Sequence, residues 1–377
     1  VLFRSLPILC LSLLARGATW TVAIDGSADF TTIQEAVDAA QDGDQIVVGP
    51  GRYDVVTDPG PWAYIVVSTK VLDFVGAGSD RTIIGPEVPE AHSDGLCGIY
   101  LVRGGSMRGF RFENCNLTGI MHYEAITIED CHFVHHGNDA TYPYGRRAVY
   151  LPSPYVSAGG HARHCRFEGL GHAVAGRGGW TLEECEFRNC ETGVYSWESS
   201  EPLMVTSCTF DAVVNAVSLR WDSSAIIDDC DLVDSRINIA LTENVQILNS
   251  RIHCSTDLQG VLIDRSSGII MTGNVVSNSA GPVIEVDRAE DLLLRDNHFI
   301  ATGTAWAVYC PPGDEPGRAL DMTGNWWGTD DPEVVAEKIW DWHDDPNSCH
   351  RVVFEPMAGQ PVRTANRTWS SVKQLFQ

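Results

Sequence analysis

A short phrase recurs along the chain at nearly constant spacing and limits the fold more than any other feature. It consists of a polar residue, a Cys and, two positions after the Cys, a Phe or Leu. The clearest copies are centred on Cys165, Cys185, Cys208 and Cys230. With weaker copies, the centres lie at residues 110, 131, 165, 185, 208, 230, 250, 274, 297 and 325. Most spacings are 20 to 24 residues, a period typical of stacked solenoids, whose single repeats cannot bury their own apolar face.

Each repeat is predicted to contain short strands. The Cys and the apolar residue two positions later share a parity, as expected for two inward side chains of one strand. A second strand follows about eight residues later, and its inward column is predicted to contain Val174, Val194, Val217, Ile239, Val261, Ile284 and Val308. No helical period is present, and the frame of leucine-rich repeats is absent. We therefore predict an all-β, right-handed parallel β-helix of about 10 to 11 coils.

The repeated Cys residues are predicted to serve packing. Five of the twelve share one inward position, namely Cys131, Cys165, Cys185, Cys208 and Cys230. A free Cys packs like a small apolar residue, and the chain has no Cys-x-x-Cys pair of the kind that binds metal. Cys310 and Cys349 lie outside this column and form the pair to test for a disulfide.

The segment 29–37 reads Asp-Phe-Thr-Thr-Ile-Gln-Glu-Ala-Val. Thr32 and Glu35 have the spacing of a capping box, and Gly43 follows where a short helix would stop. Together with Gly51-Arg52-Tyr53, this segment resembles the pectin-lyase-like superfamily, especially the start of pectin methylesterases. The resemblance implies a helix at about 32–41 that covers the open N-terminal end of the β-helix. The catalytic segments of those methylesterases are absent from this sequence, which disfavours their activity.

The chain is predicted to hold one domain with flanking segments. Residues 1–19 resemble a secretory signal peptide, because their apolar run follows Arg4 and is too short to span a membrane. Residues 20–360 form the β-helix domain, whose C-terminal cap lies at about 325–356. The segment Asn325-Trp-Trp-Gly is similar to the closing coil of many secreted bacterial β-helix proteins. A helix is predicted from Pro332 to about Trp340, and residues 361–377 form a tail.

The net charge of -24 argues against several classes of partner. Such an acidic body disfavours nucleic acid and anionic membrane surfaces. A polyanionic glycan would need a cation or a local Arg patch to bind here. We expect a monomer without a transmembrane segment that is secreted, periplasmic or on the cell surface.

Alternation along the second strand predicts a functional groove on its outward face. Neighbouring rungs lie about 4.8 Å apart, so outward residues of successive rungs form columns. The predicted substrate-binding residues are Tyr150, Arg177, Tyr195 and Trp197, and the predicted catalytic residues are Arg220, Asp264, Glu285 and Asp287. Aromatic rings suit sugars, and paired carboxylates suit glycosidic acid–base catalysis. The groove therefore predicts a carbohydrate-interacting protein, either a binder or a polysaccharide lyase or glycoside hydrolase.

Other chemistries remain open at this point. The Asn-x-Asp and Gly-His-Gly signatures of polygalacturonase-like hydrolases are missing. A lyase would use Arg177 or Arg220 as its base and often Ca²⁺, which the acidic residues could hold. Alternatively, the groove is the solvated face of a non-catalytic structural solenoid, in which Arg residues and carboxylates pair with each other.

A cluster of His residues predicts a second alternative. Seven of the twelve His residues lie between 122 and 172. The spacing of 34 residues between centres 131 and 165 places a candidate binding loop at 135–147. His135 and His136 of this loop, with His161 or His164, could bind a transition metal, as in a periplasmic copper-handling protein.

Overall fold

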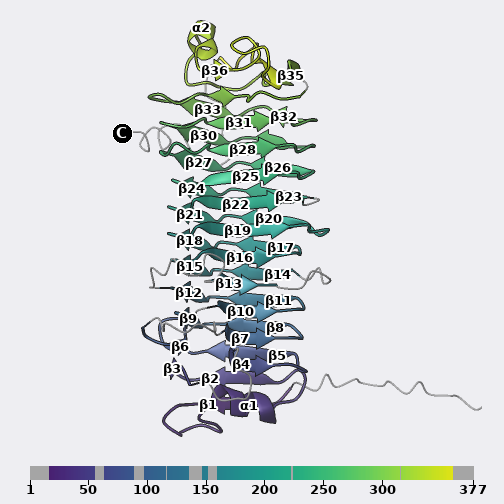
Figure 1. Cartoon of the computed structure of the whole chain (residues 1–377). Helices are drawn as coiled ribbons and strands as arrows, with labels where there is room; N and C mark the ends of the chain where they lie inside the picture. Colours follow the sequence, from purple (N-terminus) through teal and green to yellow (C-terminus); the bar gives the residue numbers. More distant parts are fainter. Residues whose placement is uncertain are drawn as a thin grey trace, which may run out of the picture.

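A computed structural model describes residues 17–55, 63–88, 97–115, 117–135, 147–151, 159–221, 224–314 and 316–359. These residues form an elongated stack of coils (Figure 1). Three long parallel sheets, named A, B and C here, contain 12, 11 and 12 strands. The predicted right-handed parallel β-helix is confirmed, with about 11 coils.

The strands are short, and each coil contributes one strand to each sheet in the order A, B, C. Sheet A contains β1 (Thr19–Val22), β2 (Gln45–Val48), β5 (Leu72–Gly76), β8 (Gly105–Arg108), β11 (Ile126–Glu129), β14 (Gly160–Arg163), β17 (Trp180–Glu183), β20 (Leu203–Thr206), β23 (Ala225–Asp228), β26 (Val245–Leu248), β29 (Ile270–Thr272) and β32 (Leu293–Leu294). Sheet B contains β3 (Gly51–Tyr53), β6 (Thr82–Ile84), β9 (Arg111–Glu113), β12 (His132–Val134), β15 (Arg166–Glu168), β18 (Glu186–Arg188), β21 (Thr209–Asp211), β24 (Asp231–Val233), β27 (Arg251–Cys254), β30 (Val275–Asn278) and β33 (His298–Ala301). Sheet C contains β4 (Ala63–Val67), β7 (Cys97–Leu101), β10 (Thr118–His122), β13 (Arg147–Tyr150), β16 (His172–Gly176), β19 (Thr192–Trp197), β22 (Asn215–Arg220), β25 (Arg236–Ala240), β28 (Val261–Asp264), β31 (Ile284–Asp287), β34 (Val308–Tyr309) and β36 (Ile339–Trp340).

The recurring phrase marks the corner between sheets A and B. Its polar residue has a left-handed backbone, as in Asp130, Ser207 and Asp229, with φ values of 51°, 52° and 53°. Asp and Asn accept this conformation more readily than other residues with a side chain. The Cys then points inward at the corner, and the following Phe or Leu lies in sheet B. The phrase therefore recurs in the sequence because each coil turns this corner once.

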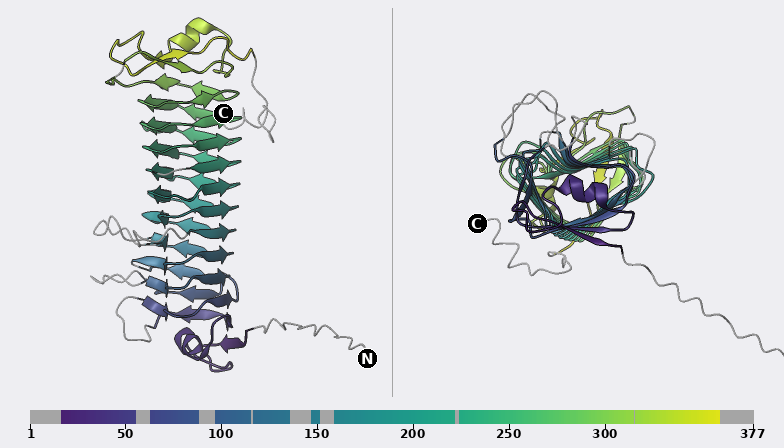
Figure 2. Two further views of the ribbon diagram at one scale, coloured as in Figure 1. Left: turned by 90° about the vertical axis from the view of Figure 1, so that its right-hand side faces the viewer. Right: turned by 90° about the horizontal axis from the view of Figure 1, so that it is seen from below.

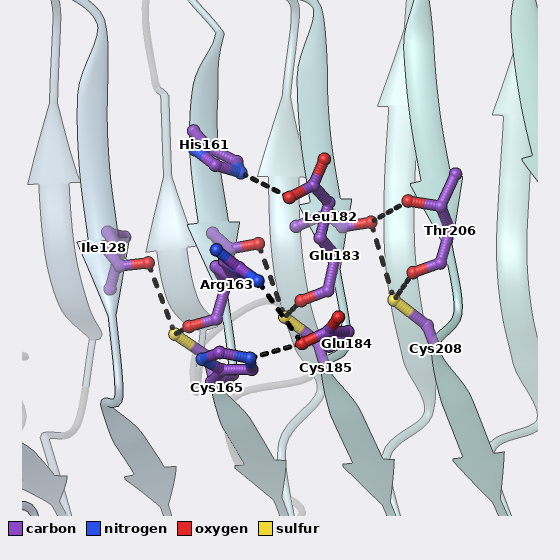
Figure 3. Close-up of polar contacts among 12 residues, drawn as sticks. Ile128, His161, Arg163, Cys165, Leu182, Glu183, Glu184, Cys185, Thr206 and Cys208 are labelled. Atoms are coloured by element: carbon purple, nitrogen blue, oxygen red, sulfur yellow. Dashed lines mark hydrogen bonds and ion pairs between the residues drawn. The ribbon is translucent and has the colours of Figure 1, made fainter.

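The Cys column is a buried part of the core. The Sγ atoms of Cys165, Cys185 and Cys208 donate to carbonyl oxygens of the preceding coil at 3.6, 3.5 and 3.6 Å (Figure 3). All five residues of the column are buried free thiols, and burial raises the pKa of Cys131 to about 12. The predicted packing role is confirmed. Cys310 and Cys349 are also buried free thiols, so no disulfide joins them in the structure.

An adjacent column consists of stacked Phe rings. Successive rings of Phe112, Phe133, Phe167, Phe187 and Phe210 have centroids 4.9, 5.2, 4.7 and 4.5 Å apart. Their planes lie 6° to 12° from parallel. Like residues stack because every coil repeats the same register, so each ring fits between the rings of its two neighbours.

The predicted inward column of sheet C contains one error. Val217 pairs with Ile237, whereas Ile239 pairs with Leu219. Ile237 therefore takes the place in the column that was predicted for Ile239. The register shifts between Asn215 and Val217, where β22 has one residue more than β25. Such a bulge changes the pairing without changing which side chains point inward, and both Ile residues are buried.

Both ends of the stack carry short helices. α1 (Ile33–Ala39) has the predicted capping box between Thr32 and Glu35 and lies over the N-terminal end of the barrel (Figure 2). α2 (Pro332–Ala336) is shorter than predicted. The predicted extension to Trp340 is wrong, because Ile339 and Trp340 form β36 and pair with β34. Nearby, β35 (Arg318–Asp321) pairs with β37 (His350–Val353).

Most of the predicted signal peptide and the whole predicted tail lie outside the described residues, as does the loop segment 136–146. Among the residues that are described, we find no helix with the length and apolar character needed to cross a membrane.

Candidate functional site

The outer face of sheet C brings most of the predicted site residues together. One outward column contains Tyr150, Ala175, Tyr195, Ser218, Asn238, Leu262, Glu285 and Tyr309. The neighbouring column contains Trp197, Arg220, Ala240, Asp264 and Asp287. Arg177 follows the last residue of β16 and forms an ion pair with Glu198. Seven of the eight predicted residues thus share this face.

Aromatic rings gather on the N-terminal half of this face, with the guanidinium group of Arg147 beside them. The rings of His172 and Tyr195 stack at 5.5 Å, and those of Tyr195 and Trp197 at 5.0 Å. The guanidinium carbon of Arg147 lies 4.0 Å from the centre of the Tyr150 ring. Flat, partly exposed rings in successive coils can stack on a ligand that runs along the solenoid axis.

Arg147 and His172 lie side by side, and each has a buried nitrogen atom without a hydrogen-bond partner among the described residues. They are register neighbours on β13 and β16. The Arg147 Nε and His172 Nδ1 atoms are buried, and neither has a hydrogen-bond partner. Burial, followed by the charge of Arg147, lowers the pKa of His172 to about 4, so its ring is neutral at physiological pH. Among the described residues, no carboxylate forms an ion pair with Arg147, and an acidic group of a ligand would supply a counter-ion for this half-buried cation.

The sequence pattern did not predict this pair, because the alternation of inward and outward side chains fails at the corner between sheets B and C. His172 and Val174 share a parity, which predicts that both point inward. Val174 is in the core, but the His172 ring stacks on the outward Tyr195. In β13, likewise, Val149 is in the core, but the guanidinium group of Arg147 lies over the ring of the outward Tyr150. A corner residue is the first of its strand, where the backbone bends.

The carboxylates at the C-terminal half fall into two kinds. Asp264 accepts two hydrogen bonds from Arg265, at 2.9 and 3.0 Å, and Asp287 accepts two from Arg288, both at 2.9 Å. Each Arg directly follows its Asp and has a left-handed backbone, which turns its side chain back over the strand. These two carboxylates are therefore charge-compensated, as in the non-catalytic alternative.

Glu285 has a different environment. Its side chain is half-buried and accepts a hydrogen bond of 2.6 Å from Gln259 Nε2. Arg236 Nη1 in turn donates to Gln259 Oε1 at 3.0 Å. Burial raises the pKa of Glu285, and the nearby charges of Asp287 and Asp264 raise it further. Of the three predicted carboxylates, this one is best placed to carry a proton.

The His residues proposed for a metal are engaged elsewhere. His161 lies 3.3 Å from Glu183 on sheet A, and His164 contacts Glu184 at the corner that follows these strands (Figure 3). His136 is outside the described residues. Within the described ranges, no three His, Cys, Asp or Glu side chains are grouped to hold a metal ion. The copper site and the Ca²⁺ site therefore remain predictions, for which the described residues show no group of metal ligands.

Comparisons with known proteins support the fold. Residues 192–311 match the family described as "Right handed beta helix region". A GH136 lacto-N-biosidase from Eubacterium ramulus is similar over 82% of this chain and 67% of its own, with 9% identity and a TM-score of 0.52. A double mutant of the periplasmic alginate epimerase AlgG is similar over 83% of this chain and 77% of its own, with 10% identity and a TM-score of 0.50. No curated protein sequence matches the chain significantly.

Proposed function

We propose that this right-handed parallel β-helix belongs to the pectin-lyase-like superfamily, and that the outer face of sheet C binds an acidic polysaccharide along the solenoid axis. The observation that carries this proposal is the pair Arg147 and His172 beside the aromatic rings, with a buried nitrogen atom in each that has no hydrogen-bond partner among the described residues. An acidic sugar would give the guanidinium its counter-ion while the rings stack on the sugar faces. The net charge of -24 would otherwise repel such a ligand. We also propose that the protein is secreted or periplasmic, where polysaccharides are found.

Replacing Arg147 by Ala tests this site directly. We expect affinity for acidic oligosaccharides to fall by about thirtyfold, since a charge-assisted hydrogen bond contributes about 1.5 to 3 kcal/mol. Arg188→Ala is the matched control, because it removes the same charge from an exposed position on sheet B. Isothermal titration calorimetry with acidic and neutral oligosaccharides provides the measurement. Equal losses in both variants, or equal binding of neutral chains, would contradict an acidic-sugar site.

The aromatic residues provide a second test of the same proposal. Trp197→Ala should weaken binding about tenfold by removing a stacking surface. Trp342→Ala is its control, since Trp342 is 38% exposed and lies in the C-terminal cap. If both replacements weaken binding equally, the loss reflects something other than contact with sheet C.

Cleavage of the bound chain is a second candidate function, favoured by the environment of Glu285. A carboxyl group with a raised pKa can protonate a glycosidic oxygen, while a neighbouring charged carboxylate assists as base or nucleophile. We propose Glu285 as the acid and Asp287, two residues along β31, as the charged partner, with Asp264 beside it. Arg220 lies 4.2 Å from the centre of the Trp221 ring and three rungs from Glu285, about 14 Å away. We therefore propose that Arg220 binds substrate.

The two candidate functions use separate parts of the face. β13, which carries Arg147, is six rungs from β31, which carries Glu285. At about 4.8 Å per rung this is about 29 Å. A ligand must be a polymer to contact both, so loss of the Arg147 contact should affect long chains and spare short ones that bind near Glu285.

A further inference from the structure

Two half-buried Arg residues of sheet C lack a carboxylate partner. The structure describes six half-buried Arg residues, namely Arg52, Arg111, Arg147, Arg177, Arg236 and Arg251. Four of them form ion pairs with a Glu or Asp side chain. Among the residues described, Arg147 and Arg236 form no such pair, although burial lowers the pKa of both guanidinium groups. A cation that is partly removed from water without a counter-ion is costly, and both exceptions lie on the same sheet.

Arg236 takes the same place in its coil as Arg147. Arg147 is the first residue of β13, and Arg236 is the first residue of β25. The three strands between them begin with His172, Thr192 and Asn215, and all five residues are register partners in turn. The corner between sheets B and C therefore carries an unbroken polar column with an Arg at each end. The two ends are four rungs apart, which is about 19 Å.

The guanidinium group of Arg236 is held in place by neutral side chains. Its Nε atom donates to Asn215 Oδ1 at 2.8 Å, and its Nη1 atom donates to Gln259 Oε1 at 3.0 Å. Gln259 in turn donates to the outward Glu285 at 2.6 Å, so this group lies on the outer face of sheet C. Within the described ranges, the Nη2 atom of Arg236 has no hydrogen-bond partner. Arg236 therefore presents a fixed cation with one donor group left for a ligand.

An acidic group of a ligand suits Arg236 better than a neutral one. A carboxylate accepts charge-assisted hydrogen bonds from a guanidinium group, and these are about twice as strong as those between neutral groups. A sugar hydroxyl can also accept a hydrogen bond from Nη2, but it supplies no counter-ion for the half-buried charge. The amides of Asn215 and Gln259 on either side carry no charge that would repel a carboxylate.

We propose that Arg236 is a second binding site for an acidic sugar on sheet C, in line with the site at Arg147. This inference rests on the proposed function, since it assumes that an acidic polysaccharide runs along this face. It adds a spacing to that function, because a polymer bound at both sites carries acidic groups about 19 Å apart. The second site also holds one acidic unit two rungs, or about 10 Å, from Glu285.

Isothermal titration calorimetry with uronic acid oligosaccharides of two lengths tests the second site. A decasaccharide reaches both sites, so Arg147→Ala and Arg236→Ala should each lower its affinity by about thirtyfold. The double replacement should lower it by about the product of the two losses, because the sites are too far apart to interact. A disaccharide reaches only one site at a time. Each single replacement should therefore lower its affinity by no more than about twofold, and the double replacement should abolish binding.

Two further variants separate loss of the charge from damage to the solenoid. Arg251→Ala is the matched control, because Arg251 is also half-buried and begins β27, but it lies on sheet B and pairs with Asp231. It should leave the affinity for both oligosaccharides unchanged. Arg236→Gln keeps a side chain that can form hydrogen bonds with Asn215 and Gln259 but has no charge. It should lose as much affinity for the decasaccharide as Arg236→Ala does.

The outcomes distinguish this inference from the proposed function. If Arg147→Ala weakens binding of the decasaccharide while Arg236→Ala and Arg236→Gln leave it unchanged, the second site is overturned and the site at Arg147 stands. An equal loss in Arg251→Ala would also overturn the second site. If no uronic acid oligosaccharide binds the original protein, the proposed function and this inference are both overturned.

Discussion

Replacing Phe187 by Ala should lower the free energy of unfolding by about 4 kcal/mol. Phe187 is fully buried, and its ring stacks between those of Phe167, at 4.7 Å, and Phe210, at 4.5 Å. Removal of the ring loses the transfer free energy of a large apolar side chain and leaves a cavity. The neighbouring rings are fixed by the register of their own coils, so they cannot collapse into that cavity.

Urea unfolding followed by circular dichroism measures this loss. Phe187→Leu should cost far less, about 1 kcal/mol, because Leu232 and Ile252 occupy the equivalent position in later coils. Val233→Ala, at an exposed position, should stay within about 0.5 kcal/mol of the original chain. A loss below about 1 kcal/mol for Phe187→Ala would mean that the Phe column does not stabilise the stack.

The architecture could be predicted from sequence because it repeats. A period of 20 to 24 residues and the shared parity of the Cys and Phe positions indicate a coil with two inward side chains. The misplaced Ile239 and the shortened α2 show where this reasoning fails. In both cases a single coil departs from the repeat, through the bulge at β22 and through the pairing of β36. A departure in a single coil does not change the average spacing of the repeats, so the period cannot predict it.

The candidate site could be predicted only in part, for a related reason. Alternation placed Tyr150, Tyr195 and Glu285 on the outer face because these residues lie within regular strands. It could not place Arg147 and His172, which begin their strands at a corner. It also could not show that Asp264 and Asp287 each pair with the next residue. Those pairs depend on the left-handed backbone of Arg265 and Arg288, which the sequence does not reveal.

The environment of Glu285 follows from three strands together. Gln259, which precedes β28, donates a hydrogen bond to the carboxyl group on β31, and Arg236, which begins β25, donates to Gln259. Burial raises the pKa of Glu285 by more than the hydrogen bond from Gln259 and the charge of Arg236 lower it, so its acid form persists to higher pH than that of an exposed Glu. A group that acts as a general acid must be protonated, and turnover should therefore fall as the pH rises through this raised pKa.

If the protein cleaves its polysaccharide, Glu285→Gln should lower turnover by about a thousandfold, since a positioned general acid contributes about 10² to 10⁴. Gln keeps the size of the side chain and cannot give up a proton, so binding measured by calorimetry should stay within about threefold. Release of reducing ends and of unsaturated uronates from acidic polysaccharides measures the reaction. Glu290→Gln is the matched control, because Glu290 pairs with Arg318 away from sheet C and its loss should leave turnover unchanged.

The same assay also separates cleavage from binding alone. Asp287→Asn should lower turnover as well, because it removes the charged partner of Glu285 on β31. If turnover survives both Glu285→Gln and Asp287→Asn, the reaction takes place elsewhere than at this end of the face. The neutral His172 beside Arg147 would then be the next acid–base group to replace. If bound acidic chains are never cleaved by the original protein, sheet C is a binding surface. The raised pKa of Glu285 would then reflect only its burial and the neighbouring charges of Asp287 and Asp264.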